Sequence, residues 1–174
     1  PVPHARQAGC RLVQLRIKKQ PEEEVLKEAI KAKALCDEYD ARLIINDFPR
    51  VAKEVSAYGI HVGLVDMPIA AVRAIVGPGM IVGGTANTFE HIQQRVHEGA
   101  DYIGLGPYRF TITKEKLSPV LGLEGYHRIL EQCRDAQINL PIVAIGGIGV
   151  DDVPALFETG VHTIAMSAAL TYSS

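Results

Sequence analysis

The chain alternates short apolar runs with longer amphipathic segments along almost its whole length. Seven of the runs are brief and nearly continuously apolar, as strands are when both faces of a parallel sheet are covered. We therefore expect strands at Arg11–Arg16, Arg42–Asp47, Gly59–Gly63, Met80–Thr85, Asp101–Gly106, Pro141–Gly147 and His162–Ala168. Strands that alternate with helices predict parallel βαβ units.

The segments between these runs have helical spacing. In Pro21–Tyr39 the apolar residues recur every three or four positions, Pro21 suits the first helical position, and three glutamates follow it near the positive end of the helix dipole. A second helix is expected after Thr88 as its N-cap and should end at Gly99. A third should carry Tyr126, Ile129 and Cys133, and a fourth should run from Asp151–Asp152 to Gly160.

The length of 174 residues predicts a single domain, residues 1–174. Seven strands fit either an open doubly wound sheet or a (β/α)8 TIM barrel whose first strand and last helix the chain lacks. We favour the barrel, because polar residues follow many different strands, and a barrel gathers all those strand ends around one mouth.

Composition excludes several classes of function. The formal net charge of −2 does not predict a nucleic-acid surface, so any bound anion must be held by a local site. The three cysteines (Cys10, Cys36 and Cys133) have no disulfide or zinc spacing, which favours a reducing, cytoplasmic location. No apolar run approaches the ~18 residues of a membrane span, and no signal peptide is expected.

Polar residues at the ends of the first strands suggest a site for a diphosphate. Gln14, Arg16 and Lys18 alternate, so they should project to the same side, where guanidinium and ammonium groups can bind phosphate oxygens. Taken alone, they could equally form a solvated loop. Asp47 and Asp66 follow the next two strands and could share one magnesium ion, although each could instead be a helix cap or a turn former.

Later strand ends suggest further phosphate contacts. Thr85 follows two glycines, which let a ligand approach the backbone. The connection Gly106–Gly122 is long and carries Thr111, Thr113 and Lys114, so it reads as a functional loop that closes on phosphate, or as a plain surface loop. The glycines of Ala144–Ile148 and the small residues of Met166–Ala169 end the last strands, where barrels often bind phosphate. We expect His61 to be a core residue.

Nine motifs in register resemble one family, thiamin phosphate synthase. They are VQLRIK, LIIND, GIHVGLVDMP, GGTANT, ADYIGLGP, TITK, PVLGLEGY, PIVAIGGI and IAMSAA, and they extend from Gly9 to about Ala169. The resemblance implies a (β/α)8 barrel that joins hydroxymethylpyrimidine diphosphate to hydroxyethylthiazole phosphate and releases pyrophosphate. It implies a magnesium-dependent transferase of thiamin biosynthesis, with small-molecule substrates and no nucleic-acid or membrane partner. A homo-oligomer stays open.

The resemblance also implies roles for individual residues. Asp47 and Asp66 would bind Mg²⁺. The pyrimidine diphosphate would be held by Gln14, Arg16, Lys18, Asn46 and Lys114, and the thiazole phosphate by Thr111, Thr113, Gly147, Ser167 and Ala168. Thr85 stands where the family often has serine and keeps its hydroxyl. The catalytic set would be Arg16, Lys18, Thr85 and Lys114.

Two positions depart from the family pattern. Asn87 replaces a frequent histidine, and related thiazole tautomerases use a histidine in that region for proton transfer. Ser167 lies one position early relative to many relatives. The absence of that histidine argues against tautomerase activity. Two alternatives to a synthase stay open: a tautomerase-like relative that binds only thiazole phosphate, and a non-catalytic phosphometabolite-binding barrel, which an incomplete barrel would fit.

Overall fold

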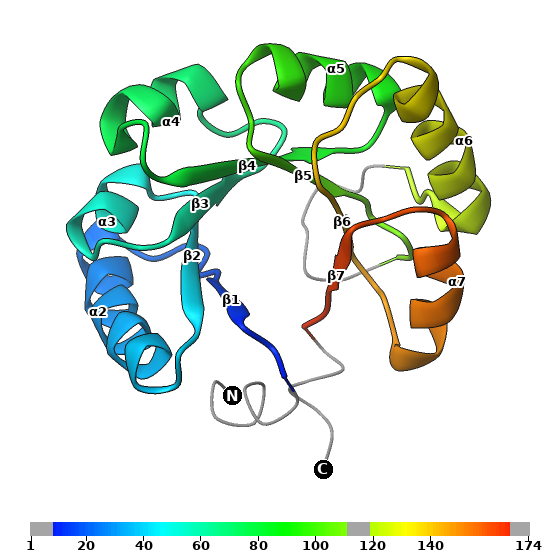
Figure 1. Cartoon of the computed structure of the whole chain (residues 1–174). Coiled ribbons are helices and arrows are strands. Elements are labelled where there is room, and N and C mark those ends of the chain that lie inside the picture. The colour runs from blue at the N-terminus through cyan, green and yellow to red at the C-terminus, as the bar shows by residue number, and fades with distance from the viewer. Residues whose placement is uncertain (1–8, 111–118, 168–174) are drawn as a thin grey trace. The chain divides into compact units, whose positions relative to one another are not determined.

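The computed structural model describes residues 9–110 and 119–167 (Figure 1). Its contacts divide the chain inside one strand into two compact units, Pro1–Gly83 and Gly84–Ser174. The expectation of a single domain stays a prediction, and the two units are described in turn.

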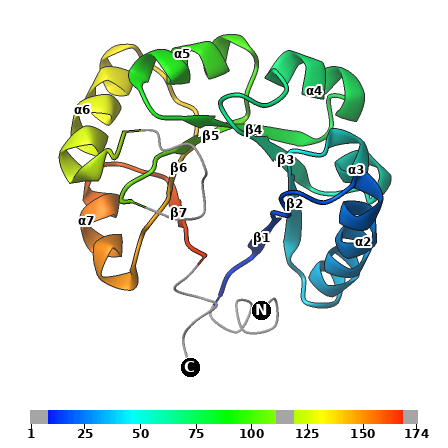
Figure 2. The same ribbon diagram turned by 180° about the vertical axis from the view of Figure 1, so that it is seen from behind.

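The first unit contains three complete parallel strands and three helices. Its elements are β1 (Leu12–Leu15), α2 (Glu22–Glu38), β2 (Arg42–Asn46), α3 (Pro49–Glu54), β3 (Gly59–Val62), α4 (Ile69–Val76) and the beginning of β4 (Ile81–Ala86). β1 pairs with β2, and β2 pairs with β3, with Leu15 opposite Ile45 and Asn46 opposite His61. Figures 1 and 2 show the helices of this unit on one face of its strands.

Apolar burial holds this unit together. Leu43, Ile45 and Ile60 are at most 1% exposed, as expected for strands covered on both faces. Three residues of the expected apolar stripe of α2 are buried, namely Val25, Ala29 and Cys36, whereas its other two members, Ala32 and Tyr39, are only partly buried. Pro21 is the N-cap of α2 and not its first helical residue, so that detail was wrong by one position.

The second unit repeats the same plan. After the end of β4 it contains α5 (Phe89–His97), β5 (Tyr102–Leu105), α6 (Gly122–Asp135), β6 (Ile142–Ile145), the short 3₁₀ helix η1 (Val150–Asp152), α7 (Val153–Glu158) and β7 (Thr163–Ala165). The predicted N-cap is confirmed, since Thr88 accepts a hydrogen bond from the His91 N–H at 3.2 Å. Gly99 and Gly160 follow their helices with φ of 83° and 98°, a conformation that favours glycine.

Tyr126 joins the helical layer of this unit to its sheet. The side chain is fully buried, and its hydroxyl donates to the Leu105 carbonyl of β5. The same hydroxyl accepts from the Ile145 N–H of β6 at 3.3 Å. Burial raises the pKa of this phenol, so it remains a neutral donor. One α6 side chain therefore fixes the ends of two neighbouring strands.

The prediction of a closed (β/α)8 barrel was wrong. The seven strands pair in the order β1-β2-β3-β4-β5-β6-β7, so the sheet formed by the described residues has β1 and β7 as its two edges. Closure requires the first and last strands to pair as well. The order also has no reversal, so the sheet is not doubly wound and lacks the switch point of that alternative.

Candidate active site

The carboxyl ends of β1 and β2 bring a lysine onto an aspartate. Gln14, Arg16 and Lys18 alternate at and beyond the end of β1, and all three are exposed. The Lys18 Nζ donates to Asp47 Oδ2, and the Asp47 side chain is 15% exposed. The structure thus unites two residues that the sequence assigned to the same site although 29 positions separate them.

The carboxyl groups of Asp47 and Asp66 lie close enough to influence each other's pKa. Asp47 follows β2 in the left-handed region with φ of 72°, and its N–H donates to the His61 carbonyl at 2.9 Å. Burial raises the pKa of Asp47, and the neighbouring Asp66 carboxyl raises it further against the opposing effect of Lys18. Burial alone would raise the pKa of Asp66 too, but hydrogen bonds from the Asp47 carboxyl and the Gly63 N–H hold it below its ordinary value.

The Asp47 carboxylate has room for another ligand. Its Oδ1 atom is buried and has no hydrogen-bond partner in the part of the chain that the structure describes. Asp66 Oδ2 accepts a hydrogen bond from the Gly63 N–H at 2.8 Å. Asp66 therefore also stabilises a turn, which was the alternative to a metal ligand that its sequence position allowed. Within residues 9–110 and 119–167, no three His, Cys, Asp or Glu side chains form a metal cage. Two carboxylates, one with an unsatisfied oxygen, suit Mg²⁺, which binds few carboxylates and keeps positions for phosphate and water.

His61 is a neighbour of this cluster that the sequence assigned to the core alone. It is 7% exposed, as predicted, and it pairs in register with Asn46, which is 6% exposed. It lies close enough to Asp66 to contribute to the lowered pKa of that carboxyl. The available signal was a polar side chain inside an apolar strand, one position before the end of β3. Such a residue lies beside the other residues at the carboxyl ends of the neighbouring parallel strands.

In the second unit the expected residues lie near or just beyond the carboxyl ends of the strands. Thr85 is 4% exposed in β4, and its carbonyl accepts from the Arg95 Nε at 3.2 Å. Gly147 follows β6, and Ser167 follows β7 and is exposed. The remaining expected residues, Thr111, Thr113, Lys114 and Ala168, lie outside the described residues.

Gly147 occupies a position that only glycine fits. Its φ is 72°, and a Cβ atom there would lie 2.9 Å from the Arg109 carbonyl oxygen and 3.0 Å from that of Phe110. The segment after β5 therefore runs directly against this turn, with the Arg109 N–H donating to the Gly146 carbonyl at 3.0 Å. Such close backbone packing is the setting in which N–H groups can be presented to an anion.

An ion pair beside Gly147 was missed by the sequence analysis. Arg109 donates through both terminal nitrogens to Asp152 of η1, at 2.7 Å each, and also to the Gly147 carbonyl at 3.3 Å. The hydrogen bonds from Arg109, and then the one from the Gly149 N–H, lower the pKa of Asp152. The bond to Asp152 raises the pKa of Arg109. No sequence signal links residues 43 positions apart, and Asp152 reads simply as part of a helix start.

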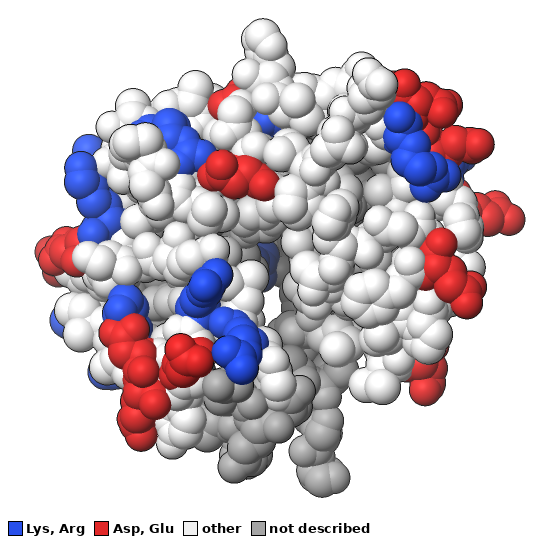
Figure 3. Space-filling model, in the orientation of Figure 1, with Lys and Arg blue, Asp and Glu red and all other residues white. Residues whose placement is uncertain are grey.

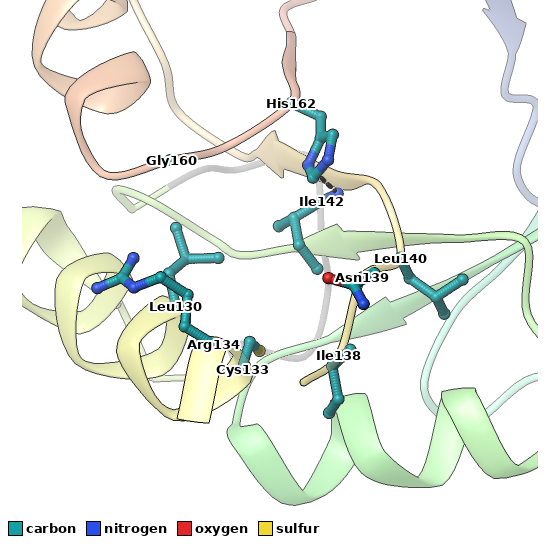
Figure 4. A pocket seen from close by; sticks show the side chains of 9 residues that line it. All are labelled: Leu130, Cys133, Arg134, Ile138, Asn139, Leu140, Ile142, Gly160 and His162. Carbon is teal, nitrogen blue, oxygen red and sulfur yellow. Dashed lines mark hydrogen bonds between the residues drawn. The ribbon is translucent and has the colours of Figure 1, made fainter. Parts of the chain in front are cut away.

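A cavity of about 210 Å³ in the second unit is not the candidate site (Figure 4). Ile142 and His162 line it where β6 and β7 begin, at the opposite strand ends from Gly147 and Ser167. His162 Nδ1 accepts there from the Ile142 N–H at 3.1 Å. This hydrogen bond gives His162 a structural role.

On the face that Figure 3 shows, basic and acidic side chains of the described residues are interspersed and form no large patch of one sign. This face therefore offers an ion no extended field of one sign, and the pair of Lys18 and Asp47 is a local charged site of the first unit. No helix in the described part of the chain combines the length and the apolar character that crossing a bilayer requires.

Comparison with known proteins identifies the family. A family model described as thiamine monophosphate synthase matches residues 2–170. A thiamine-phosphate synthase of Phocaeicola vulgatus is 51% identical over 166 residues, which are 95% of this chain and 80% of that protein. One of Flavobacterium psychrophilum is 50% identical over 165 residues, again 95% of this chain and 80% of that protein.

Comparison with solved structures supports the same family. A thiamine phosphate pyrophosphorylase from Pyrococcus furiosus has a TM-score of 0.83 and 34% identity, over 97% of this chain and 78% of that one. FabK from Thermotoga maritima has a TM-score of 0.73, covering 96% of this chain and 53% of that one, but its 17% identity shows likeness of fold alone. The comparisons confirm the predicted family and, with it, the synthase class of transferase.

Proposed function

The chain belongs to the thiamine monophosphate synthase family, and we propose that it joins hydroxymethylpyrimidine diphosphate to hydroxyethylthiazole phosphate with Mg²⁺ as cofactor. The observation that carries the proposal is the cluster of Lys18, Asp47 and Asp66, in which Asp47 keeps a buried oxygen without a partner. A protein that bound only thiazole phosphate would have no use for that cluster.

The first unit is assigned to the pyrimidine diphosphate. Asp47 and Asp66 would hold Mg²⁺, which when bound neutralises charge on the departing diphosphate. Lys18 balances Asp47 in the structure and is close enough to contact a diphosphate bound there. Gln14 and Arg16 are exposed at alternate positions with Lys18, and they supply an amide and a guanidinium group for the diphosphate. Asn46 is buried at the end of β2.

The second unit is assigned to the thiazole phosphate. Gly147 would offer its N–H to the phosphate, joined by backbone groups at Ser167 and Ala168. We assign the Thr85 hydroxyl a contact with the bound substrates. Among the residues that lie outside the described ranges, Thr111 and Thr113 remain predicted phosphate contacts, and Lys114 a predicted contact of the diphosphate.

The reaction exchanges one bond for another at the pyrimidine methylene carbon. The bond from this carbon to the diphosphate oxygen breaks, and pyrophosphate leaves with the electron pair. The thiazole nitrogen then donates its lone pair to the carbon and becomes a quaternary thiazolium nitrogen. No proton is lost in this step, so the residues need to stabilise charge and position the two substrates, and a general base is not required.

Calorimetric titration with each substrate separately distinguishes this proposal from its rivals. We expect hydroxyethylthiazole phosphate to bind with or without Mg²⁺, and hydroxymethylpyrimidine diphosphate to bind with Mg²⁺ and much more weakly without it. Binding of thiazole phosphate alone would indicate the tautomerase-like relative. Binding of both substrates, with no thiamin phosphate formed when the two are then combined with Mg²⁺, would indicate a phosphometabolite-binding protein.

We propose a cytoplasmic location because Cys10, Cys36 and Cys133 are all free thiols. Self-association stays a prediction, and size-exclusion chromatography with light scattering tests it.

A further inference from the structure

Asn87 bonds to both ends of one long connection. It lies one residue beyond β4 and is 3% exposed. Its amide nitrogen Nδ2 donates to the Gly106 carbonyl at 3.1 Å and to the Pro119 carbonyl at 2.8 Å. Gly106 follows β5 directly and Pro119 lies just before α6, so one side chain spans the start and the end of the β5–α6 connection.

Backbone bonds draw the same two ends together. The Leu121 N–H donates to the Pro107 carbonyl, and the Gly122 N–H donates to the Tyr108 carbonyl, each at 3.0 Å. We call these two bonds, with the two Asn87 bonds, the neck of the connection. All of these residues belong to the second unit.

The Asn87 backbone is itself fixed by α5. Its N–H donates to His91 Nδ1 at 3.4 Å, and the N-cap Thr88 holds the His91 N–H. The side chain therefore projects from a rigid strand-to-helix turn. Both hydrogens of the amide are used, one for each carbonyl, which a carboxylate cannot reproduce because it has only acceptors.

We propose that Asn87 is a positioning residue for the synthase reaction, acting through the neck of the β5–α6 connection. The inference rests on the proposed function, in which the Gly147 N–H contacts the thiazole phosphate. The neck holds the segment that begins at Gly106, and Arg109 of this segment packs directly against the Gly146–Gly147 turn. Asn87 holds Gly106 and Pro119 at a fixed separation and so sets where the connection leaves and rejoins the fold. This role differs from proton transfer, for which a neutral amide is unsuited.

The decisive variant is Asn87→Asp, which keeps the shape of the side chain but removes both donors. We expect kcat to fall on the order of 10²-fold, as for a misplaced catalytic group, while the KM for hydroxymethylpyrimidine diphosphate changes much less. Asn139→Asp is the matched control, because Asn139 is exposed, lies between α6 and β6, and donates to Gln137 instead. The control should retain wild-type kcat.

The pH profile separates positioning from a general loss of stability. At low pH the introduced carboxyl becomes protonated and can donate to one of the two carbonyls, so the kcat deficit of Asn87→Asp should shrink as the pH falls. Asn87→Ala has no proton to regain and should show the same deficit at every pH. Equal deficits for the two variants at all pH values, or wild-type kcat in both, would overturn the proposal.

Hydrogen exchange provides a readout that does not depend on activity. The Leu121 and Gly122 N–H groups close the neck and should exchange faster in Asn87→Asp than in wild type or Asn139→Asp. Unchanged exchange at both would overturn the role of Asn87 in the neck. A wild-type chain that makes no thiamin phosphate but shows this exchange pattern would refute the proposed function while retaining the neck.

Discussion

At the scale of single residues, the candidate site depends on side chains whose environment is costly without a ligand. Asp47 is the clearest case, because its pKa is raised by burial and Oδ1 has no partner among the described residues. The sequence could predict Asp47, Asp66 and Lys18 as site residues, since each follows a strand. It could not predict that Lys18 pairs with Asp47, because side-chain contacts between loops depend on the packed fold.

Asp47→Asn should separate activity from stability. Without metal, the neutral amide avoids the cost of a buried charge, so we expect the free energy of unfolding to be unchanged or to rise by about 1 kcal/mol. Turnover with Mg²⁺ should fall by about 10²-fold or more, because the metal loses a ligand. Steady-state kinetics and urea unfolding measure the two effects, with the exposed Asp37→Asn as control. Wild-type turnover in Asp47→Asn would refute the metal assignment.

Gly147→Ala tests the turn after β6. A Cβ atom would meet two backbone carbonyls at 2.9 and 3.0 Å in a left-handed conformation, so we expect a loss of about 1–3 kcal/mol in stability and weaker binding of thiazole phosphate. Gly149→Ala is the control, because φ at Gly149 is −101° and a Cβ atom there would lie an ordinary 3.5 Å from Asp152 Oδ2. Thermal unfolding and calorimetry should show a large effect for the first variant and a small one for the second.

At the scale of elements, the sequence predicted the seven strands and the four named helices to within a few residues. Apolar runs and capping residues are local signals, and Thr88, Gly99 and Gly160 act where they were expected to act. Contacts between loops could not be predicted from the sequence. The pair of Arg109 and Asp152, which ties the segment after β5 to η1, joins loops whose proximity follows from strand pairing.

This pair predicts a pH dependence of stability. The folded pKa of Asp152 is lowered by the hydrogen bonds from Arg109 and the Gly149 N–H, so its contribution is present above the unfolded value of about 3.9 and is lost as the pH falls through the folded pKa. Asp152→Asn should therefore lower Tm near neutral pH, and the difference from wild type should narrow below about pH 4. High salt should also reduce this Tm difference, because Arg109 is about half exposed and its charge is screened.

The neighbouring exposed residue provides the control for that measurement. Asp151→Asn removes the same charge from η1 without touching the pair. Thermal unfolding of the three proteins between pH 2 and pH 7 should show the narrowing for Asp152→Asn alone. An equal and pH-independent Tm difference in both variants would assign the effect to net charge.

At the scale of the whole molecule, local patterns predicted parallel βαβ units but did not determine closure. The strands follow one another in order without reversal, as the alternation of strand and helix implied. Whether the first strand pairs with the last is a property of the complete sheet, and no residue in Leu12–Leu15 or Thr163–Ala165 encodes it locally. Family membership, by contrast, was predictable because nine motifs occur in register over nearly the whole chain.

The most direct test of the account is the stoichiometry of the reaction catalysed by the purified chain. Both substrates are incubated with and without Mg²⁺, and thiamin phosphate and pyrophosphate are quantified together. The account predicts that the two products appear in equal amounts, at a rate that depends on Mg²⁺ and falls in Asp47→Asn. Absence of thiamin phosphate with both substrates and Mg²⁺ present, or equal rates with and without the metal, would contradict it.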